Sequence, residues 1–282
     1  MRMMTTSMGF IICALLLAGG CKSLAPEIPV YPIKDYFDDG QLRAIYFAYT
    51  NSAAIEVKHG VYTSYWEGGQ KKKEAHYNRG VLEGREASWY ENGLMSAVCS
   101  YSVGKKDGEE KRWFGDGQLK ELWQYKAGKI DGVCKGWYPN GFKMVEIEYR
   151  KGLRHGSAKD WYDTGKPFST TTYVSDKQEG VKTGFYQSGA KKYESLFHND
   201  QRQGRSFAWD KSGKVIAGGI YRDDLPWTGT FIVKWDSEDK WTKAEFKEGI
   251  KISETSQSSP PTANGNVGIR ENEIFTKKQE RQ

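Results

Sequence analysis

The chain has 282 residues, of which 28% are charged and 14% aromatic, and it carries a formal net charge of +6 at pH 7. Lysines alternate with acidic residues along the chain, whereas a nucleic-acid-binding surface needs a basic stripe with little acid in it. We therefore predict no nucleic-acid partner. The 32 glycines recur at fixed spacing, which is typical of a repeat protein and not of a low-complexity segment.

Residues 1–20 have the pattern of an export signal, with Arg2 followed by an apolar stretch over 9–18 that is too short to span a bilayer. Small residues lead directly into Cys21, and this arrangement resembles the lipobox of bacterial lipoproteins. The resemblance implies cleavage before Cys21 and acylation of that cysteine, which would attach the chain to a membrane of the cell envelope. Lys22 stands where an inner-membrane retention signal would be acidic, which favours the outer membrane. A soluble secreted protein and an uncleaved anchor remain as alternatives.

Residues 21–32 contain three prolines and are predicted to form an extended tether. Residues 33–59 resemble a degenerate copy of the repeat that follows, because Asp39-Gly40 precedes a β-rich run. Terminal copies are usually atypical because they cap the array.

The repeat domain is predicted over residues 60–250. Each unit opens with a glycine, counted as offset 0, and has an aromatic pair at offsets 5 and 6, Gly at 9, Tyr or Phe at 17, and Gly or Asp at 20. The opening glycines recur every 24 residues: Gly60, Gly84, Gly108, Gly132, Gly156, Gly180 and Gly204. An eroded eighth copy begins at Gly229. Residues 251–282 are rich in Ser, Pro and Asn and are predicted to be disordered.

Short aromatic segments separated by Asn92-Gly93 or Asn140-Gly141 predict β-hairpins with type I′ turns. The resulting register pairs offset 5 with 12 and offset 0 with 17, so that a Tyr ring would lie over the opening glycine. Offsets 6, 11, 13, 15 and 17 would then share the more apolar face, with offsets 5, 12, 14 and 16 on the other. The predicted fold is all-β, an elongated antiparallel meander of about sixteen strands that twists into a ribbon or trough.

The repeated pattern GxxxxWYxxGxxxxxxxYxxGxxxG resembles the bacterial variant of the MORN repeat, as found in the YwqK-like antitoxin family. The resemblance covers residues 60–249 and implies a β-hairpin array with an interaction or scaffold role. It also leaves open a role in immunity against a toxin that acts in the envelope.

The aromatic rows supply the candidate binding residues. On the more mixed face, Trp89, Trp113, Trp137 and Trp161 at offset 5 are candidates for stacking on a sugar or on an apolar surface of a partner. The rings at offsets 6 and 17 are expected to be more buried. Cys99 and Cys134 are predicted to be free thiols, because three strands separate them and a disulfide needs Cα atoms within about 7 Å.

No catalytic constellation, metal-ligand spacing or phosphate-binding loop is found, so we expect no enzyme activity, no metal and no cofactor. The expected function is that of an envelope lipoprotein whose repeat sheet binds a protein partner or organises a complex. The alternatives are binding of glycan or peptidoglycan and the immunity role. The partner itself is not identified by the sequence.

Overall fold

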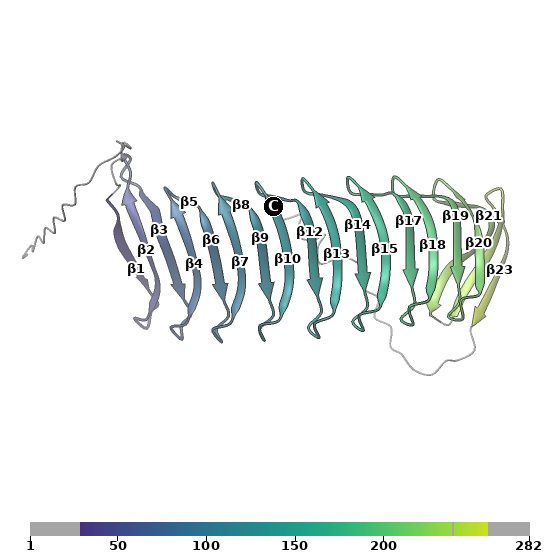
Figure 1. Cartoon of the computed structure of the whole chain (residues 1–282), viewed down its shortest axis with the longest axis horizontal. Coiled ribbons are helices and arrows are strands. Elements are labelled where there is room, and N and C mark those ends of the chain that lie inside the picture. Colours follow the sequence, from purple (N-terminus) through teal and green to yellow (C-terminus); the bar gives the residue numbers. More distant parts are fainter. Residues whose placement is uncertain (1–28, 239, 259–282) are drawn as a thin grey trace, which may run out of the picture.

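A computed structural model describes residues 29–238 and 240–258, and these residues form a single open antiparallel β-sheet (Figure 1). The predicted all-β repeat meander is therefore confirmed. The signal peptide over 1–20, the lipidation site Cys21 and residues 259–282 lie outside the described residues. Within the described ranges, no helix is long and apolar enough to cross a membrane.

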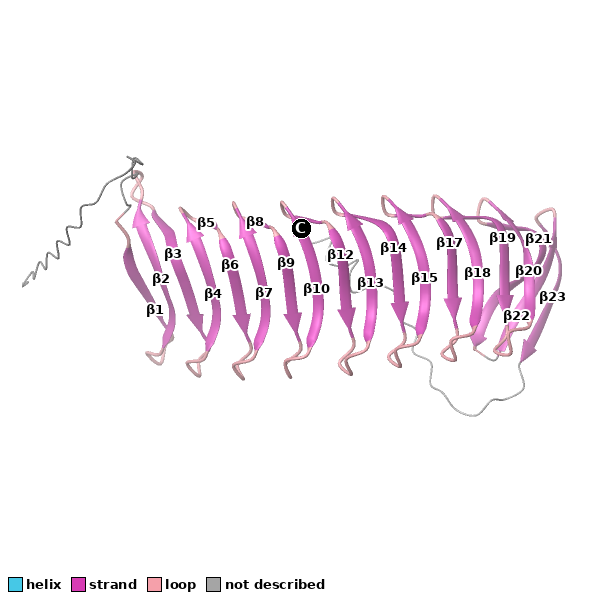
Figure 2. Ribbon diagram, viewed as in Figure 1, coloured by secondary structure: helices cyan, strands magenta, loops and turns pink. Residues whose placement is uncertain are grey.

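The strands follow one another across the sheet in chain order. Short loops join them at both ends of the strands (Figure 2). They are β1 (Tyr31–Tyr36), β2 (Leu42–Thr50), β3 (Glu56–Tyr65), β4 (Lys71–Asn78), β5 (Val81–Leu82), β6 (Gly84–Trp89), β7 (Met95–Ser102), β8 (Lys105–Lys106), β9 (Gly108–Trp113), β10 (Leu119–Lys126), β11 (Lys129–Ile130), β12 (Gly132–Trp137), β13 (Lys143–Arg150), β14 (Leu153–Trp161), β15 (Pro167–Val174), β16 (Lys177–Gln178), β17 (Gly180–Phe185), β18 (Lys191–His198), β19 (Gln201–Trp209), β20 (Val215–Arg222), β21 (Leu225–Ser237), β22 (Lys240–Lys247) and β23 (Ile250–Ser258).

Four strands have only two residues, namely β5, β8, β11 and β16, and each is continued by the strand that follows it. Counting each such pair once leaves 19 strands side by side among the 23. At a spacing of about 4.8 Å the sheet is roughly 90 Å wide.

Two predicted boundaries are corrected at the ends of the sheet. Strand β1 begins at Tyr31, inside the predicted tether, and β23 extends the sheet to Ser258, beyond the predicted boundary at residue 250. Pro32 is tolerated because β1 is an edge strand and no further strand needs its missing N–H. The polar β23 pairs along its whole length with β22, because an unpaired edge strand offers a row of free backbone groups.

The turn after each aromatic pair differs from the predicted type I′ turn. Gly93 N donates to Tyr90 O at 3.0 Å, Tyr90 N donates to Leu94 O at 2.9 Å, and of the central residues only Gly93 has a positive φ, +81°. This is a type I turn followed by a glycine in a G1 bulge. Asn92 favours it because its Oδ1 accepts a hydrogen bond from Leu94 N at 3.1 Å.

The bulge changes the register that follows the turn. Trp89 pairs with Met95, so offset 5 faces offset 11 and not 12, whereas the predicted pairing of offset 0 with 17 is confirmed by Gly84 and Tyr101. Offset 12 moves to the opposite face, where Met144 packs against the core. We call the face with offsets 2, 4, 6, 12, 13, 15 and 17 the tyrosine face, and the face with offsets 1, 3, 5, 11, 14 and 16 the tryptophan face.

The type I′ turns lie at the opposite ends of the strands, where they join one unit to the next at offsets 19 and 20. Val103 and Gly104 have φ values of 48° and 73° between the paired residues Ser102 and Lys105. In a later unit Asp176 takes the place of the second glycine with φ 70°, and its Oδ1 accepts a hydrogen bond from Arg154 N at 2.8 Å. Asp tolerates this conformation better than most residues.

The opening glycines are required by backbone conformation and not by a ring above them. Gly132 has a φ of +119°, and a Cβ there would lie 1.9 Å from Gln124 Oε1, a side chain of the tryptophan face. The predicted explanation, a Tyr ring covering the glycine, is therefore wrong. The true cause is a bulge at the start of each unit that only glycine adopts without strain.

The core lies on the tyrosine face of the middle units. It consists of the buried residues Trp123, Tyr125, Ile130, Cys134, Val145, Ile147, Tyr149, Ala158 and Tyr173. Cys99 and Cys134 are both buried and free, as predicted. The greater burial predicted for the rings at offset 17 is confirmed in four of the seven units, by Tyr125, Tyr149, Tyr173 and Tyr221, whereas at offset 6 only Tyr186 is buried and the other rings are half-buried like the tryptophans.

Candidate functional site

The four predicted tryptophans lie on the tryptophan face, each at the end of the first long strand of its unit. Trp89 ends β6, Trp113 ends β9, Trp137 ends β12 and Trp161 ends β14, and all four are half-buried. Each pairs with the residue at offset 11 of the same unit, as Trp113 does with Leu119. The structure therefore places them in one row across the sheet.

Lysines cover the two outer members of this row. The Nζ atom of Lys71 lies 5.2 Å from the centroid of the Trp89 ring, and that of Lys143 lies 4.9 Å from the Trp161 ring. Both are cation–π distances. Each lysine also forms an ion pair with the glutamate three residues on, at 2.6 Å for Lys71–Glu74 and 2.8 Å for Lys143–Glu146.

The hydrogen bond from Lys143 lowers the pKa of the Glu146 carboxyl. The same arrangement recurs at Lys191, which lies 5.6 Å from the Trp209 ring and pairs with Glu194 at 2.7 Å. The lysine, the glutamate and the next unit's ring thus form a recurring polar cover over the tryptophan face.

The Gly84, Gly108, Gly156 and Gly204 units lack this cover, and the first two of these units are consecutive. At offsets 11 and 14, Met95 and Val98 replace the Lys–Glu pair in one unit, and Leu119 and Leu122 replace it in the next. An uninterrupted apolar row results, which we call the central row: Trp89, Met95, Trp113, Leu119 and Trp137.

Charged residues border the central row. Lys71 covers Trp89 at one end, and Lys143 pairs with Trp137 at the other. Beside the row, Leu122 pairs with Lys111 on one neighbouring strand and with Lys135 on the other. The result is a half-buried apolar strip framed by ion pairs, since Lys111 lies 2.9 Å from Glu109 and Lys135 lies 3.9 Å from Glu146.

Sequence reasoning identified the tryptophans of this strip but missed Met95 and Leu119. The wrong register placed offset 11 on the opposite face, which separated these residues from the rings they adjoin. The signal that would have revealed them is the interruption of the Lys-x-x-Glu pattern in two successive units.

The tyrosine face carries charges that are paired within the sheet. Glu110, only 2% exposed, accepts hydrogen bonds from Lys106 at 2.8 Å and Arg112 at 2.7 Å. Glu121 accepts one from Trp123 Nε1 at 3.0 Å. Burial raises the pKa of the neighbouring Tyr125 hydroxyl. These charged groups neutralise one another, as buried charges must. We therefore assign them a structural role.

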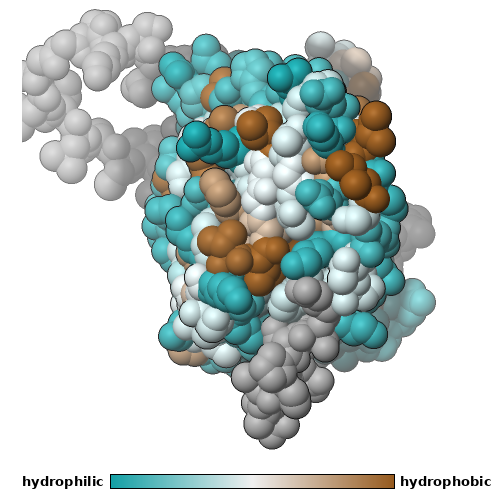
Figure 3. Space-filling model, turned by 90° about the vertical axis from the view of Figure 1, so that its right-hand side faces the viewer, coloured by the Kyte–Doolittle hydropathy of each residue, from teal (hydrophilic) through white to brown (hydrophobic). Residues whose placement is uncertain are grey.

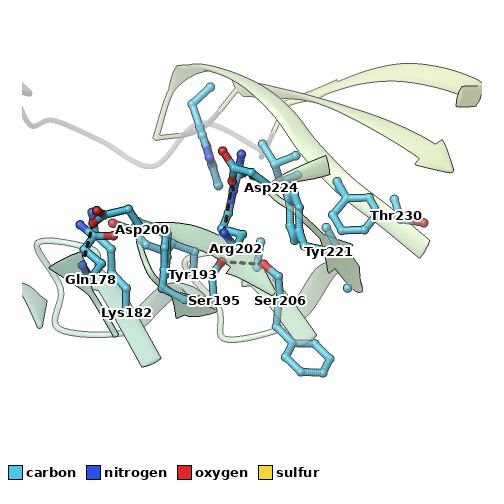
Figure 4. A pocket seen from close by; sticks show the side chains of 18 residues that line it. Gln178, Lys182, Tyr193, Ser195, Asp200, Arg202, Ser206, Tyr221, Asp224 and Thr230 are labelled. Atoms are coloured by element: carbon cyan, nitrogen blue, oxygen red, sulfur yellow. Dashed lines mark hydrogen bonds and ion pairs between the residues drawn. The ribbon is translucent and has the colours of Figure 1, made fainter. Parts of the chain in front are cut away.

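A cavity of about 390 Å³ lies at the C-terminal end of the tyrosine face (Figure 4). Tyr193 of β18 and Phe231 and Trp235 of β21 line it together, because the long β21 bends over the preceding strands. Arg202 donates to Asp224 at 2.6 Å within it, and the hydroxyls of Ser195 and Ser206 lie 2.7 Å apart. Six of its 18 lining residues are aromatic, and charged or polar residues, among them Lys182, Asp200 and the Arg202–Asp224 pair, make up much of the remainder.

The end of the sheet beyond this cavity exposes apolar side chains. Figure 3 shows clusters of hydrophobic residues among polar ones when the molecule is viewed from this end. Ile250 is 71% and Ile252 58% exposed on the edge strand β23.

In residues 29–238 and 240–258, no group of three or more His, Cys, Asp or Glu side chains is placed to hold a metal ion.

Comparison with protein families finds the MORN repeat variant three times in the chain, at residues 58–79, 106–127 and 154–175. Each match spans one hairpin and falls on every second unit. The units between them have the same spacing and the same strands. MORN repeats suggest a repeat protein-binding module. A comparison with curated proteins found no match.

Proposed function

We propose that this protein binds a protein partner through the central row while an acylated Cys21 holds it in the bacterial cell envelope, at the outer membrane. The observation that carries the proposal is the loss of the Lys–Glu cover over two consecutive units, which leaves Trp89, Met95, Trp113, Leu119 and Trp137 as a continuous apolar strip. Apolar strips framed by polar residues mark protein interaction sites.

The chemistry of the strip defines the kind of partner. Within residues 29–238 and 240–258 no cation lies above Trp113 or Trp137, and these two tryptophans are suited to be anchors that insert between a partner's side chains. Lys111 and Lys135 beside the strip are paired with Glu109 and Glu146, so they favour a partner whose apolar contact is bordered by polar residues of either charge. The partner is therefore an apolar protein surface with a polar rim.

The sharpest test restores the cover that the neighbouring units already have. Met95→Lys with Val98→Glu, and Leu119→Lys with Leu122→Glu, rebuild the pattern of Lys71–Glu74 in a fold known to accept it. A photo-crosslinker at position 111, beside the strip, in the full chain in intact envelopes should give a discrete crosslinked partner, and the rebuilt variants should lose it.

The matched control makes the opposite exchange at the flank, Lys191→Met with Glu194→Val, and should leave the crosslink unchanged. An undiminished crosslink in the rebuilt variants would remove the central row as the binding surface. The anchor is tested separately by incorporation of labelled palmitate, which should disappear in Cys21→Ala.

A second candidate function is binding of glycan, including peptidoglycan, and it rests on the same two uncovered rings. Sugars stack on open aromatic faces, and Lys71 and Lys143 already occupy the faces of Trp89 and Trp161. Stacking would therefore involve Trp113 and Trp137. Co-sedimentation with purified sacculi should be lost in Trp113→Ala with Trp137→Ala, and unchanged sedimentation would exclude this function.

A further inference from the structure

The cavity at the C-terminal end of the tyrosine face exists because small residues replace large ones on its floor. At offset 15, Trp123 and Ile147 fill the middle of the face, whereas Ser195 stands at the same offset near its C-terminal end. On the next two strands, Ala208 and Ala217 pair with each other and also line the cavity. The floor is therefore low at this place, which leaves a cavity of about 390 Å³.

Strand β21 supplies the opposite wall. It has 13 residues, and it contacts β19 as well as its ladder partner β20. Its bend brings Phe231 and Trp235 to the same cavity as Tyr193 of β18, which lies three strands away in the ladder. The cavity is thus enclosed between the sheet and a strand of the same sheet.

Two rings of β18 give the floor an aromatic surface. A Cβ at Gly184 would lie 2.2 Å from Tyr193 Cε1, so the tyrosine ring rests with one face on the backbone of β17 and lines the cavity with the other. Phe197 is half-buried beside the cavity, whereas Tyr149 and Tyr173 at the same offset are buried. Both rings therefore keep surface for contact with a ligand.

Polar groups with unused hydrogen-bonding capacity lie beside these rings (Figure 4). The hydroxyls of Ser195 and Ser206 are 2.7 Å apart, and only one of their two hydrogens can lie between the oxygens. The other hydroxyl hydrogen can donate to a ligand. Asp224 accepts from Arg202 Nε at 2.6 Å through Oδ1, so its Oδ2 can accept a hydrogen bond from a ligand.

The charges that line the cavity balance. The positive charges are those of Lys182 and Arg202. Asp200 and Asp224 supply an equal number of negative charges, so a charged ligand would meet no excess of the opposite sign. A wholly apolar ligand would bury the serine hydroxyls and the Asp224 carboxylate without hydrogen bonds, which is costly. The lining therefore suits an uncharged ligand that has both apolar faces and hydroxyl groups.

We propose that this cavity binds an uncharged mono- or disaccharide. A sugar presents C–H groups on the faces of its ring, which contact the negatively polarised faces of aromatic side chains. The hydroxyls around its rim donate to carboxylates and accept from hydroxyl and guanidinium groups. The volume lies near the lower end of the range of about 300–1,000 Å³ for small-molecule pockets, which fits a ligand of this size. The site lies on the opposite face of the sheet from the central row.

Saturation-transfer NMR on the purified full chain tests the proposal with glucose, N-acetylglucosamine, maltose, cellobiose and N,N′-diacetylchitobiose as probes. At least one of these sugars should bind at millimolar concentration, with the strongest transfer to the C–H protons of its ring, because these protons contact the aromatic side chains. Glucuronic acid, the charged counterpart of glucose, should bind no more tightly than glucose.

Two substitutions inside the cavity should abolish binding, and each has a matched control outside it. Ser195→Ile introduces the residue that Ile147 provides at the same offset and fills the cavity from its floor. Trp235→Ala removes a ring from the opposite wall. Thr171→Ile makes the corresponding change at offset 15 of the preceding unit, and Trp227→Ala removes another tryptophan of β21; both controls should bind as wild type does. Unfolding midpoints show that each variant is folded, and Ser195→Ile decides the matter if Trp235→Ala does not fold.

The proposal would be overturned if no sugar of the panel bound, or if binding survived both substitutions in the cavity. Equal loss in the control variants would also overturn it, and tighter binding of glucuronic acid would show that the ligand is not neutral. Trp113→Ala with Trp137→Ala should leave the binding of these sugars unchanged, so failure here and failure of the central row as a binding surface are separate results. Loss of sugar binding in that double variant would move the site to the central row.

Discussion

The hydroxyl of Tyr138 donates a hydrogen bond of 2.8 Å to the carbonyl oxygen of Trp161, which lies in the following unit. The same bond joins Tyr90 to Trp113 and Tyr186 to Trp209, both at 2.7 Å. Each bond ties the turn of one hairpin to the strand end of the next. In a repeat array these interfaces between neighbours determine the stability of the whole.

The junction after the Gly108 unit lacks this bond, because Phe114 stands in place of the tyrosine and has no hydroxyl to donate to Trp137 O. Phe114→Tyr should therefore stabilise the array by about 1 kcal/mol, the usual net value of an intramolecular hydrogen bond. Thermal unfolding and amide hydrogen exchange in β9–β12 should both show the gain. The reverse change Tyr138→Phe is the control and should cost a similar amount; a loss of stability in Phe114→Tyr would contradict the argument.

The sequence was sufficient to predict the repeat, the meander and the pairing of offset 0 with 17, because these follow from the glycine and tyrosine spacing. It did not reveal the bulge at offset 12, since Asn-Gly fits both a type I′ turn and a type I turn with a G1 glycine. The one extra residue in this bulge determines whether Met95 lies beside Trp89 or on the opposite face. The tryptophans could thus be predicted as candidates from the sequence. The apolar residues that join them into a row could be identified only from the observed strand register.

Val103 occupies an unfavourable backbone conformation in a type I′ turn. Its φ is 48° and its side chain is 75% exposed, so no packing compensates for the strain of a β-branched residue there. Val103→Asn should stabilise the protein by about 1 kcal/mol, because Asn tolerates this region. Val81→Asn is the matched control, since Val81 is 41% exposed in the extended strand β5 and should gain nothing. Equal gains at both positions would show that replacing an exposed valine by a polar side chain stabilises the protein whatever its φ.

Two glycines of one turn distinguish the conformational requirement from a lack of space. Gly117 has a φ of +90°, and a Cβ there would meet only Leu94 Cδ1 at an ordinary 3.8 Å; at Gly115 nothing lies within 4 Å and φ is not in the left-handed region. Gly117→Ala should cost about 1–2 kcal/mol, whereas Gly115→Ala should be neutral or slightly stabilising. Urea unfolding of the two variants measures the difference. Equal stabilities would mean that the turn adopts another conformation.

The Lys143–Glu146 pair gives the cover of the tryptophan face a defined pH dependence. The hydrogen bond from Lys143 lowers the pKa of Glu146 below 4.5, so the folded state favours the ionised carboxylate. The pair therefore contributes its full stabilisation above the carboxyl's pKa in the unfolded chain and loses it as the pH falls through the lower folded value. Glu146→Gln should destabilise the protein slightly at pH 7, by less than about 1 kcal/mol for a partly exposed pair.

The difference between wild type and Glu146→Gln should shrink as the pH falls from about 5 to about 3, because protonation removes the charge that the variant lacks. Unfolding midpoints measured across this range test the sign. In a Lys143→Met background, the same change at Glu146 should show almost no pH dependence, since the donor that lowers the pKa is absent. A pH dependence that persists in that background would assign the effect to another group, with Lys135 the nearest candidate at 3.9 Å.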